Sequence, residues 1–154
     1  MPPMRLGVRA GLLLAAAVLL LPARANAANC SISTTSVAFG TYNVFSASPL
    51  DSTGTVTIQC TGNANVQINL DKGGAATFAG RRMLKGSEPL SYNLYTDAAR
   101  TLIWGDGTSG TSTYTQNGVP NNTPVTVTIY GQVPADQDVT AGSYSNTVTA
   151  VVNF

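Results

Sequence analysis

Short segments in which apolar and polar residues alternate are the feature that most constrains the fold of this chain. A period of two is typical of half-buried β-strands, because successive side chains of a strand point to opposite faces. No helical periodicity of useful length follows residue 27. About eight short strands separated by turn residues predict an all-β sandwich or barrel. The expected strands are 30–46 (kinked at Gly40), 55–60, 65–70, 77–86, 89–97, a pair around an Asp106-Gly107 turn within 100–116, 123–133 and 143–154, with turns at 46–54, 71–76 and 134–142.

The last segment, AGSYSNTVTAVVNF (141–154), is unusual for a chain terminus. One face carries Tyr144, Val148, Ala150, Val152 and Phe154. Most termini fray, whereas this one ends on an aromatic residue in phase with the apolar face. The stretch 143–154 contains no Lys, Arg, Asp, Glu or Pro. A long uncharged edge of this kind is a template for the addition of another strand.

Residues 1–27 have the three regions of a secretory signal peptide: a basic start, an apolar run at 11–21 and the small-x-small site Ala25-Asn26-Ala27. The alternative is a membrane anchor. The apolar run is too short for that role, because a spanning helix needs ~20 residues. We therefore expect cleavage between Ala27 and Ala28, a mature domain of 28–154, and no membrane insertion.

Removal of that segment leaves five of the eight basic residues against seven acidic ones, a net charge of −2. No basic patch is available to bind nucleic acid or an anionic membrane. Many Thr, Ser, Asn and Gly residues with few charges are typical of an extracellular β-protein.

Two cysteines, Cys30 and Cys60, predict a disulfide in an exported chain. A redox pair or a metal site is the alternative, but the sequence has no Cys-x-x-Cys motif and no histidine. Cys30 begins the first expected strand and Cys60 ends the second, so the bond would join neighbouring strands near one end of the fold. Closing a loop of this length contributes roughly 3–4 kcal/mol in the chain-entropy model.

The residue types argue against catalysis, and no cofactor or metal is expected. Without histidine, Ser–His and Cys–His arrangements are impossible. Lys72 and Lys85 lie in polar, glycine-rich stretches, where solvated charge is the better interpretation than a low-pKa base. The acids most open to a calcium interpretation lack calcium-loop spacing, and turn formation explains them better. They are Asp97, Asp106, Asp136 and Asp138.

Three further patterns have two interpretations each. Arg81 and Arg82 could contact an anionic partner or keep an edge strand soluble. Asn121-Asn122-Thr123 matches a glycosylation sequon that often occurs by chance. Trp104 could form a sugar-stacking platform with nearby tyrosines, although core packing is favoured. Those tyrosines are Tyr92, Tyr95 and Tyr114.

Four stretches together resemble the spore coat protein U domain family, which includes the pilin subunits of archaic chaperone–usher pili. They are CSISTTSVAFGTYN (30–43), GTVTIQCTG (54–62), LSYNLYTDAARTLIWGDG (90–107) and VTIYGQVPADQDVTAGSYSNTVTAVVNF (127–154). The resemblance covers nearly all of 30–154, and its middle and final blocks are distinctive.

The resemblance implies an immunoglobulin-like sandwich that lacks its last strand. In such pili the missing strand leaves an apolar groove between the first and final strands. A periplasmic chaperone fills it, and another pilin subunit replaces the chaperone at the outer-membrane usher. The implied groove residues are Phe39, Tyr42, Val148, Ala150, Val152 and Phe154.

One feature departs from the pilin pattern. With cleavage after Ala27, only Ala28 and Asn29 precede Cys30, which is too short for a donor strand. We therefore expect a subunit that accepts a strand without giving one, at a terminal or minor position of a surface pilus. The alternatives are a secreted spore- or cell-coat protein with a self-completed sandwich, and a sugar-binding adhesive module based on Trp104.

Overall fold

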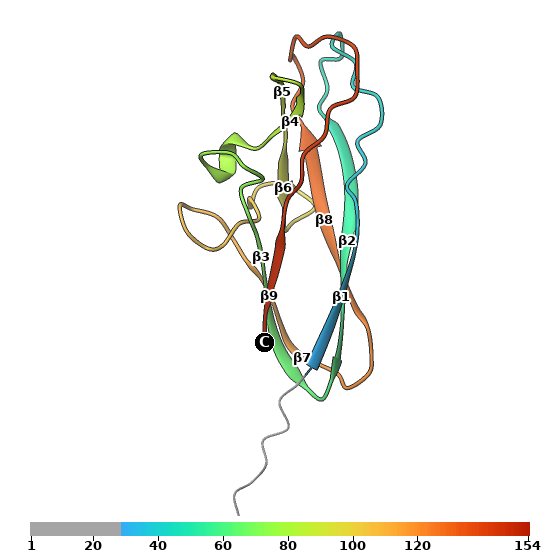
Figure 1. Cartoon of the computed structure of the whole chain (residues 1–154), viewed down its shortest axis with the longest axis vertical. Helices are drawn as coiled ribbons and strands as arrows, with labels where there is room; N and C mark the ends of the chain where they lie inside the picture. Colours follow the sequence, from blue (N-terminus) through green and yellow to red (C-terminus); the bar gives the residue numbers. More distant parts are fainter. Residues whose placement is uncertain (1–28) are drawn as a thin grey trace, which may run out of the picture.

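The computed structural model describes residues 29–154, which form nine β-strands and one turn of 3-10 helix (Figure 1). The predicted signal peptide and its cleavage site at Ala27 and Ala28 lie outside the described residues. The elements are β1 (Asn29–Thr35), β2 (Leu50–Thr61), β3 (Ala64–Leu70), η1 (Phe78–Gly80), β4 (Arg82–Lys85), β5 (Glu88–Ser91), β6 (Asn93–Tyr95), β7 (Tyr114–Val119), β8 (Val125–Val133) and β9 (Ala150–Asn153).

The strands form two packed antiparallel sheets and a hairpin. One sheet has the order β1-β2-β8-β6, the second has the order β7-β3-β9, and β4 pairs with β5. Within residues 29–154 there is no helix long and apolar enough to cross a membrane. The predicted all-β architecture is confirmed. The molecule is elongated, and several long loops gather at one end (Figure 1).

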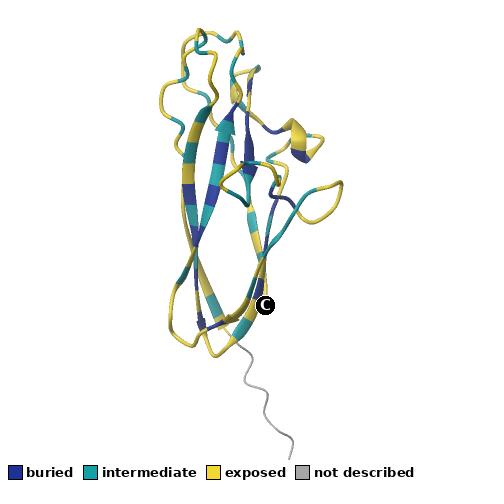
Figure 2. Ribbon diagram, turned by 180° about the vertical axis from the view of Figure 1, so that it is seen from behind, coloured by how far each residue is buried: buried dark blue, intermediate teal, exposed yellow. Residues whose placement is uncertain are grey.

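The core follows the alternation seen in the sequence. Inward positions of the long central strands are buried, while their neighbours are exposed or half-buried (Figure 2). The buried residues on these strands are Val56, Ile58, Cys60, Val66, Ile68, Leu70, Val127, Ile129 and Val133.

The predicted disulfide is present. Cys30 on β1 and Cys60 on β2 are direct partners in the antiparallel register, and their sulfur atoms are 2.08 Å apart. The bond therefore fixes the start of the edge strand β1 to the core.

The predicted first strand, 30–46, is too long, and the predicted turn at 46–54 is wrong in its second half. β1 ends at Thr35, and β2 already begins at Leu50. The cause lies at Gly54, where a Cβ atom would stand 2.7 Å from the Thr35 carbonyl oxygen and 2.9 Å from Val37 Cγ2. The chain crosses over this glycine and leaves the edge of the sheet.

The predicted strand 77–86 is also corrected. Its first half is the helix η1, whose cap Thr77 accepts a hydrogen bond from the Gly80 amide. Only Arg82–Lys85 pairs as a strand, with β5. The predicted strand 143–154 shortens to β9, because the residues before Ala150 leave β3 and run beside β4.

The segment 100–116 does not form the predicted hairpin, and it closes one lateral side of the sandwich instead. The Trp104 amide donates to the Leu94 carbonyl of β6 (2.8 Å), and the Leu70 amide of β3 donates to the Gly105 carbonyl (3.1 Å). The Trp104 indole N–H donates to the Ile68 carbonyl (2.9 Å). Hydrogen bonds through residues 104–105 thus join the two sheets on this side.

Arg81 is a core residue, so its interpretation as an edge-solubilising charge is wrong. The side chain is 0% exposed, whereas Arg82 is exposed. Its guanidinium donates to the carbonyl oxygens of Asp71 and Trp104 and to the Asn93 side-chain oxygen (3.0 Å). Burial lowers the pKa of Arg81. One side chain thus donates hydrogen bonds to oxygen atoms of three separate segments, next to the closed side of the sandwich.

We predict that Arg81→Leu lowers the free energy of unfolding by about 3–5 kcal/mol, because two buried backbone carbonyls lose their donor and the Asn93 side-chain oxygen keeps only the Leu94 amide. Arg82→Leu is the matched control and should change it by less than about 0.5 kcal/mol. Urea unfolding of both variants measures the difference. Equal losses would contradict the structural role of Arg81.

Candidate functional site

A groove runs along the lateral side of the sandwich opposite to the closed one. It lies between residues 32–45, called here the N-terminal wall, and residues 139–150, called the C-terminal wall. Two adjoining cavities fill it. The loop-side cavity, about 820 Å³, lies between 37–45 and 139–144, and the strand-side cavity, about 650 Å³, lies between 32–39 and 144–150.

The floor of the groove is the hydrophobic core itself. Core residues from both sheets line the strand-side cavity, and others line the loop-side cavity. They are Val56, Leu70, Tyr92, Leu94 and Ile129 in the first, and Leu90 and Val133 in the second. A complete sandwich would cover such residues with an edge strand, whereas here side chains of the two walls cover them and leave each no more than 7% exposed.

The two walls do not pair with each other. Across the described residues, no backbone hydrogen bond joins 29–45 to 137–154. β1 pairs only with β2, and β9 pairs only with β3. Each is the edge strand of its sheet, and both edges border the groove. The one direct hydrogen bond found between these segments is at the loop end, where the Gln137 amide donates to the Tyr42 hydroxyl.

Part of the backbone along both walls is therefore available to bond with an added chain, although the Ala38 carbonyl already accepts from the Ser52 hydroxyl. Within 36–42 no backbone-to-backbone hydrogen bond is formed. On the C-terminal wall, Ser145 exchanges both of its backbone bonds with Leu84 of β4. Because alternate residues of an extended chain direct these groups to opposite edges, the groups of Tyr144 and Asn146 point toward the groove.

The lining of both cavities contains no Lys, Arg, Asp or Glu. Charged side chains are the common protection of a free sheet edge against strand addition. The groove lacks that protection, and its chemistry suits an extended, uncharged segment with apolar side chains.

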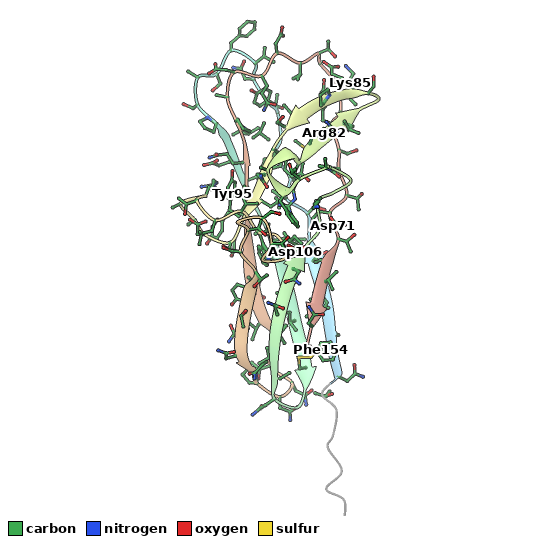
Figure 3. All side chains as sticks on the ribbon, turned by 90° about the vertical axis from the view of Figure 1, so that its left-hand side faces the viewer. Asp71, Arg82, Lys85, Tyr95, Asp106 and Phe154 are labelled. Atoms are coloured by element: carbon green, nitrogen blue, oxygen red, sulfur yellow. A yellow bond between two sulfur atoms is a disulfide. The ribbon has the colours of Figure 1, made fainter. Side chains whose placement is uncertain are left out.

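The C-terminal wall is held from its outer side by the β4–β5 hairpin. Besides the Leu84–Ser145 pair, the Asn146 side-chain amide donates to the Arg82 carbonyl (2.5 Å). Glu88 accepts from the Thr140 hydroxyl and amide, and Lys85 donates to the Thr140 hydroxyl and the Ala141 carbonyl. Figure 3 shows Lys85 and Arg82 on this hairpin.

Hydrogen bonds also shift the pKa of two acids that anchor this wall. The Thr140 hydroxyl, then the Thr140 amide, lowers the pKa of Glu88 from 4.5 to about 2. At the foot of the wall, partial burial raises the pKa of Asp71, but bonds from the Gly73 and Thr149 amides outweigh it, so the net shift is downward. Both carboxylates are therefore charged, and both fix wall backbone.

Four of the six predicted groove residues line the cavities. Phe39 borders both, Tyr42 the loop-side cavity, and Val148 and Ala150 the strand-side cavity. Val152 packs on the core opposite Ile68 but lines neither cavity. Phe154 lies beyond β9, is 61% exposed and lines neither cavity, so its expected position on the buried face is wrong (Figure 3).

Sequence reasoning missed several lining residues, among them Val37, Met83 and Tyr144. A signal for Val37 existed in the glycines at 54 and 131. A Cβ atom at either position would stand within 3 Å of a Val37 methyl group. Glycines at inward positions of long strands indicate that another side chain occupies their place.

The alternative site built on Trp104 does not exist as a surface. Trp104 is 0% exposed, and its ring packs beside Tyr114 with centroids 6.0 Å apart. The turn interpretation of Asp97 and Asp106 is confirmed by their bonds. Asp97 accepts from the amides of Thr101 and Leu102, and Asp106 accepts from Thr108. Among residues 29–154, no group of three potential ligand side chains is placed to hold a metal ion.

Comparison with known proteins gives a consistent result. The family model described as the Spore Coat Protein U domain matches residues 16–151. Protein U of Myxococcus xanthus is 38% identical over 132 residues, covering 75% of this chain and 70% of that protein.

A solved structure has the same fold. It is a chain in the crystal structure of the CsuC–CsuE chaperone–tip adhesion subunit pre-assembly complex from archaic chaperone–usher Csu pili of Acinetobacter baumannii. The TM-score is 0.60 at 22% identity, over 83% of the present chain. The present chain spans 40% of that chain's length.

We predict that Glu88 titrates near pH 2 in the folded protein, well below its usual 4.5, as measured by NMR of the side-chain carboxyl carbon. Because the folded-state pKa is the lower one, its stabilising effect is complete above about pH 4.5 and is lost as the pH falls toward 2. Thr140→Val should raise the pKa of Glu88, whereas Thr147→Val, on the same wall, should not. Titration near 4.5 in the unaltered protein would contradict the proposed contact.

Proposed function

Because the chain belongs to the Spore Coat Protein U domain family, a family of structural proteins rather than enzymes, we propose that it is a subunit of a surface pilus that accepts a β-strand from another polypeptide. A periplasmic chaperone fills the groove first, and the extension of another pilin subunit replaces it at an outer-membrane usher. The fold shared with a chain of the Csu chaperone–subunit complex supports this assignment.

The observation that carries the proposal is the contrast between the two lateral sides of the sandwich. On one side, the bonds of Trp104 and Gly105 join the sheets. On the other, the two edge strands border a groove with an apolar floor and no charged lining. An edge with unpaired backbone groups above an apolar surface is the arrangement that strand addition uses.

The expected energetics are large for a domain of this size. A strand that buries four or five apolar side chains contributes on the order of 6–15 kcal/mol before the cost of ordering it. The stability of a whole domain is only ~5–15 kcal/mol. We therefore propose that the free subunit is marginal and that the complemented subunit is highly stable.

We further propose that this subunit accepts a strand and donates none. With cleavage at the predicted Ala27–Ala28 bond, two residues would precede Cys30, and the disulfide holds Cys30 against β2. A terminal or minor position in the fibre fits such a chain. N-terminal sequencing of the exported protein tests the cleavage site on which this position depends.

A spore- or cell-coat protein is the second candidate. The family's description and the 38% identity to Protein U favour it. The open groove counts against the version in which residues 29–154 complete their own sandwich. A coat role would then also use strands supplied by a neighbouring molecule.

We predict that a donor segment stabilises the exported chain. Co-expression with a chaperone of this pilus class, or fusion of an alternating apolar strand through a flexible linker after Phe154, should raise the yield. A net gain of about 4 kcal/mol would raise the melting temperature by about 10–20 °C. A fused strand with a central proline is the control, because proline cannot donate to a ladder. Equal melting temperatures for the free and complemented forms would count against the open groove.

A second test separates groove binding from folding. Ile32 lines the strand-side cavity but is 43% exposed in the free domain. Ile32→Asp should change the stability of the free form little and weaken strand binding by about a hundredfold or more, because the carboxylate becomes buried on insertion. Leu102→Asp, at a site 51% exposed and outside the groove, is the matched control. Undiminished binding by Ile32→Asp would place the strand elsewhere.

A further inference from the structure

Phe39, called here the partition, lies at the boundary between the two cavities of the groove. Three alternate positions of β8 face the groove in succession: Ile129, Gly131 and Val133. Ile129 lines only the strand-side cavity, and Val133 lines only the loop-side cavity. Gly131 lies between them and has no side chain. Phe39 borders both cavities, as do Val37, Met83 and Tyr144, and of these four Phe39 and Val37 lie over Gly131.

The Phe39 ring occupies the place that a side chain at position 131 would take. A Cβ atom built there would stand 2.8 Å from Phe39 Cζ and 3.0 Å from Phe39 Cε1, so a side chain at position 131 would force the ring to move. The neighbouring Val37 Cγ1 would be 2.6 Å from the same atom. Gly131 thus leaves a gap in the inward face of the sheet, and the side chains of Phe39 and Val37 fill that gap.

The ring also meets Tyr92, the residue before β6, which is the strand that pairs with β8. The two ring centroids are 5.8 Å apart at 67°, an edge-to-face geometry that aromatic pairs prefer. Tyr92 is 6% exposed and lines the strand-side cavity, whereas Leu90, two residues earlier, lines the loop-side cavity. Phe39 therefore lies over Gly131 and against the Tyr92 ring, between Ile129 and Val133 on the β8 side of the groove.

We propose that Phe39 selects the strand that this subunit accepts: large apolar side chains at two positions four residues apart, with a small residue midway between them. This inference rests on the proposed strand-accepting function and specifies the partner's sequence. Ile129 lines one cavity and Val133 lines the other, and the four residues between them span ~13 Å of extended chain. An inserted strand directs every second side chain inward, so its middle inward residue faces the partition.

Only glycine, alanine or serine fits at that middle position while Phe39 stays in place. A larger residue has to displace the ring from both Gly131 and Tyr92. The Phe39 ring has no other place over Gly131 to move to, because the Val37 methyl group already occupies the rest of that space.

Two synthetic peptides test the partition against the exported full-length protein. KTLTATLTK carries alanine at the middle inward position, and KTLTLTLTK carries leucine there. Fluorescence anisotropy should give at least about tenfold tighter binding of the alanine peptide. In Phe39→Ala the two cavities merge, and the leucine peptide should then bind at least as tightly as the alanine peptide.

Leu102→Ala is the control, since Leu102 is 51% exposed and lines neither cavity, and it should keep the preference for alanine. Phe39→Leu, which retains an apolar side chain, provides a second variant if Phe39→Ala does not fold, and its preference should fall between the other two.

Equal binding of both peptides to the unaltered protein overturns the partition while leaving strand acceptance intact. An alanine preference that persists in both Phe39 variants also overturns it. Binding of neither peptide overturns strand acceptance, and the partition with it.

Discussion

The two edge strands on one lateral side of the sandwich do not pair with each other within residues 29–154, and the other features of the structure are arranged around this unpaired side. Buried amide and carbonyl groups are almost always paired in folded proteins. On the closed side, Leu70, Leu94 and Gly105 meet this requirement with bonds between segments. On the groove side the requirement is left to water or to another chain, while side chains of the walls keep each core residue beneath the groove no more than 7% exposed.

The path of residues 36–45 follows from the same constraint. Had the first strand continued along β2, Val37 and Phe39 would have stayed at the edge of the sheet. Instead the chain crosses Gly54, and both side chains enter the space between the sheets. They cover part of the core, so the groove is narrower than a whole missing strand would leave it. The cost is that backbone groups in 36–42 give up ladder bonds.

Much of the fold could be predicted from sequence, because alternation reports directly on which face of a strand is buried. β3 and β8 lie within a residue or two of their predicted bounds, and the pairing of Cys30 with Cys60 is as expected. Alternation could not locate the ends of β1 and β9. There the alternation of apolar residues continues after the strand pairing stops, because the side chains still pack while the backbone no longer pairs.

The burial of Arg81 could not be predicted, because arginine is rarely buried and its acceptors are carbonyls that no residue pattern encodes. The groove residues Phe39 and Val148 could be predicted from the family resemblance and from the alternation of apolar residues, whereas the role of Gly131 is visible only in the three-dimensional structure.

A domain with one uncovered edge must hold both walls from behind, and each wall has its own attachment. The disulfide ties the start of β1 to β2. The β4–β5 hairpin bonds the C-terminal wall through Ser145 and Thr140 on the side away from the groove. Arg81 joins the loop at Asp71, which anchors the foot of that wall, to the closed side at Trp104. None of these attachments uses the groove-facing edge of either wall. In the proposed function, an incoming strand would find both edges already spaced and oriented, and little of its binding free energy would be spent on ordering them.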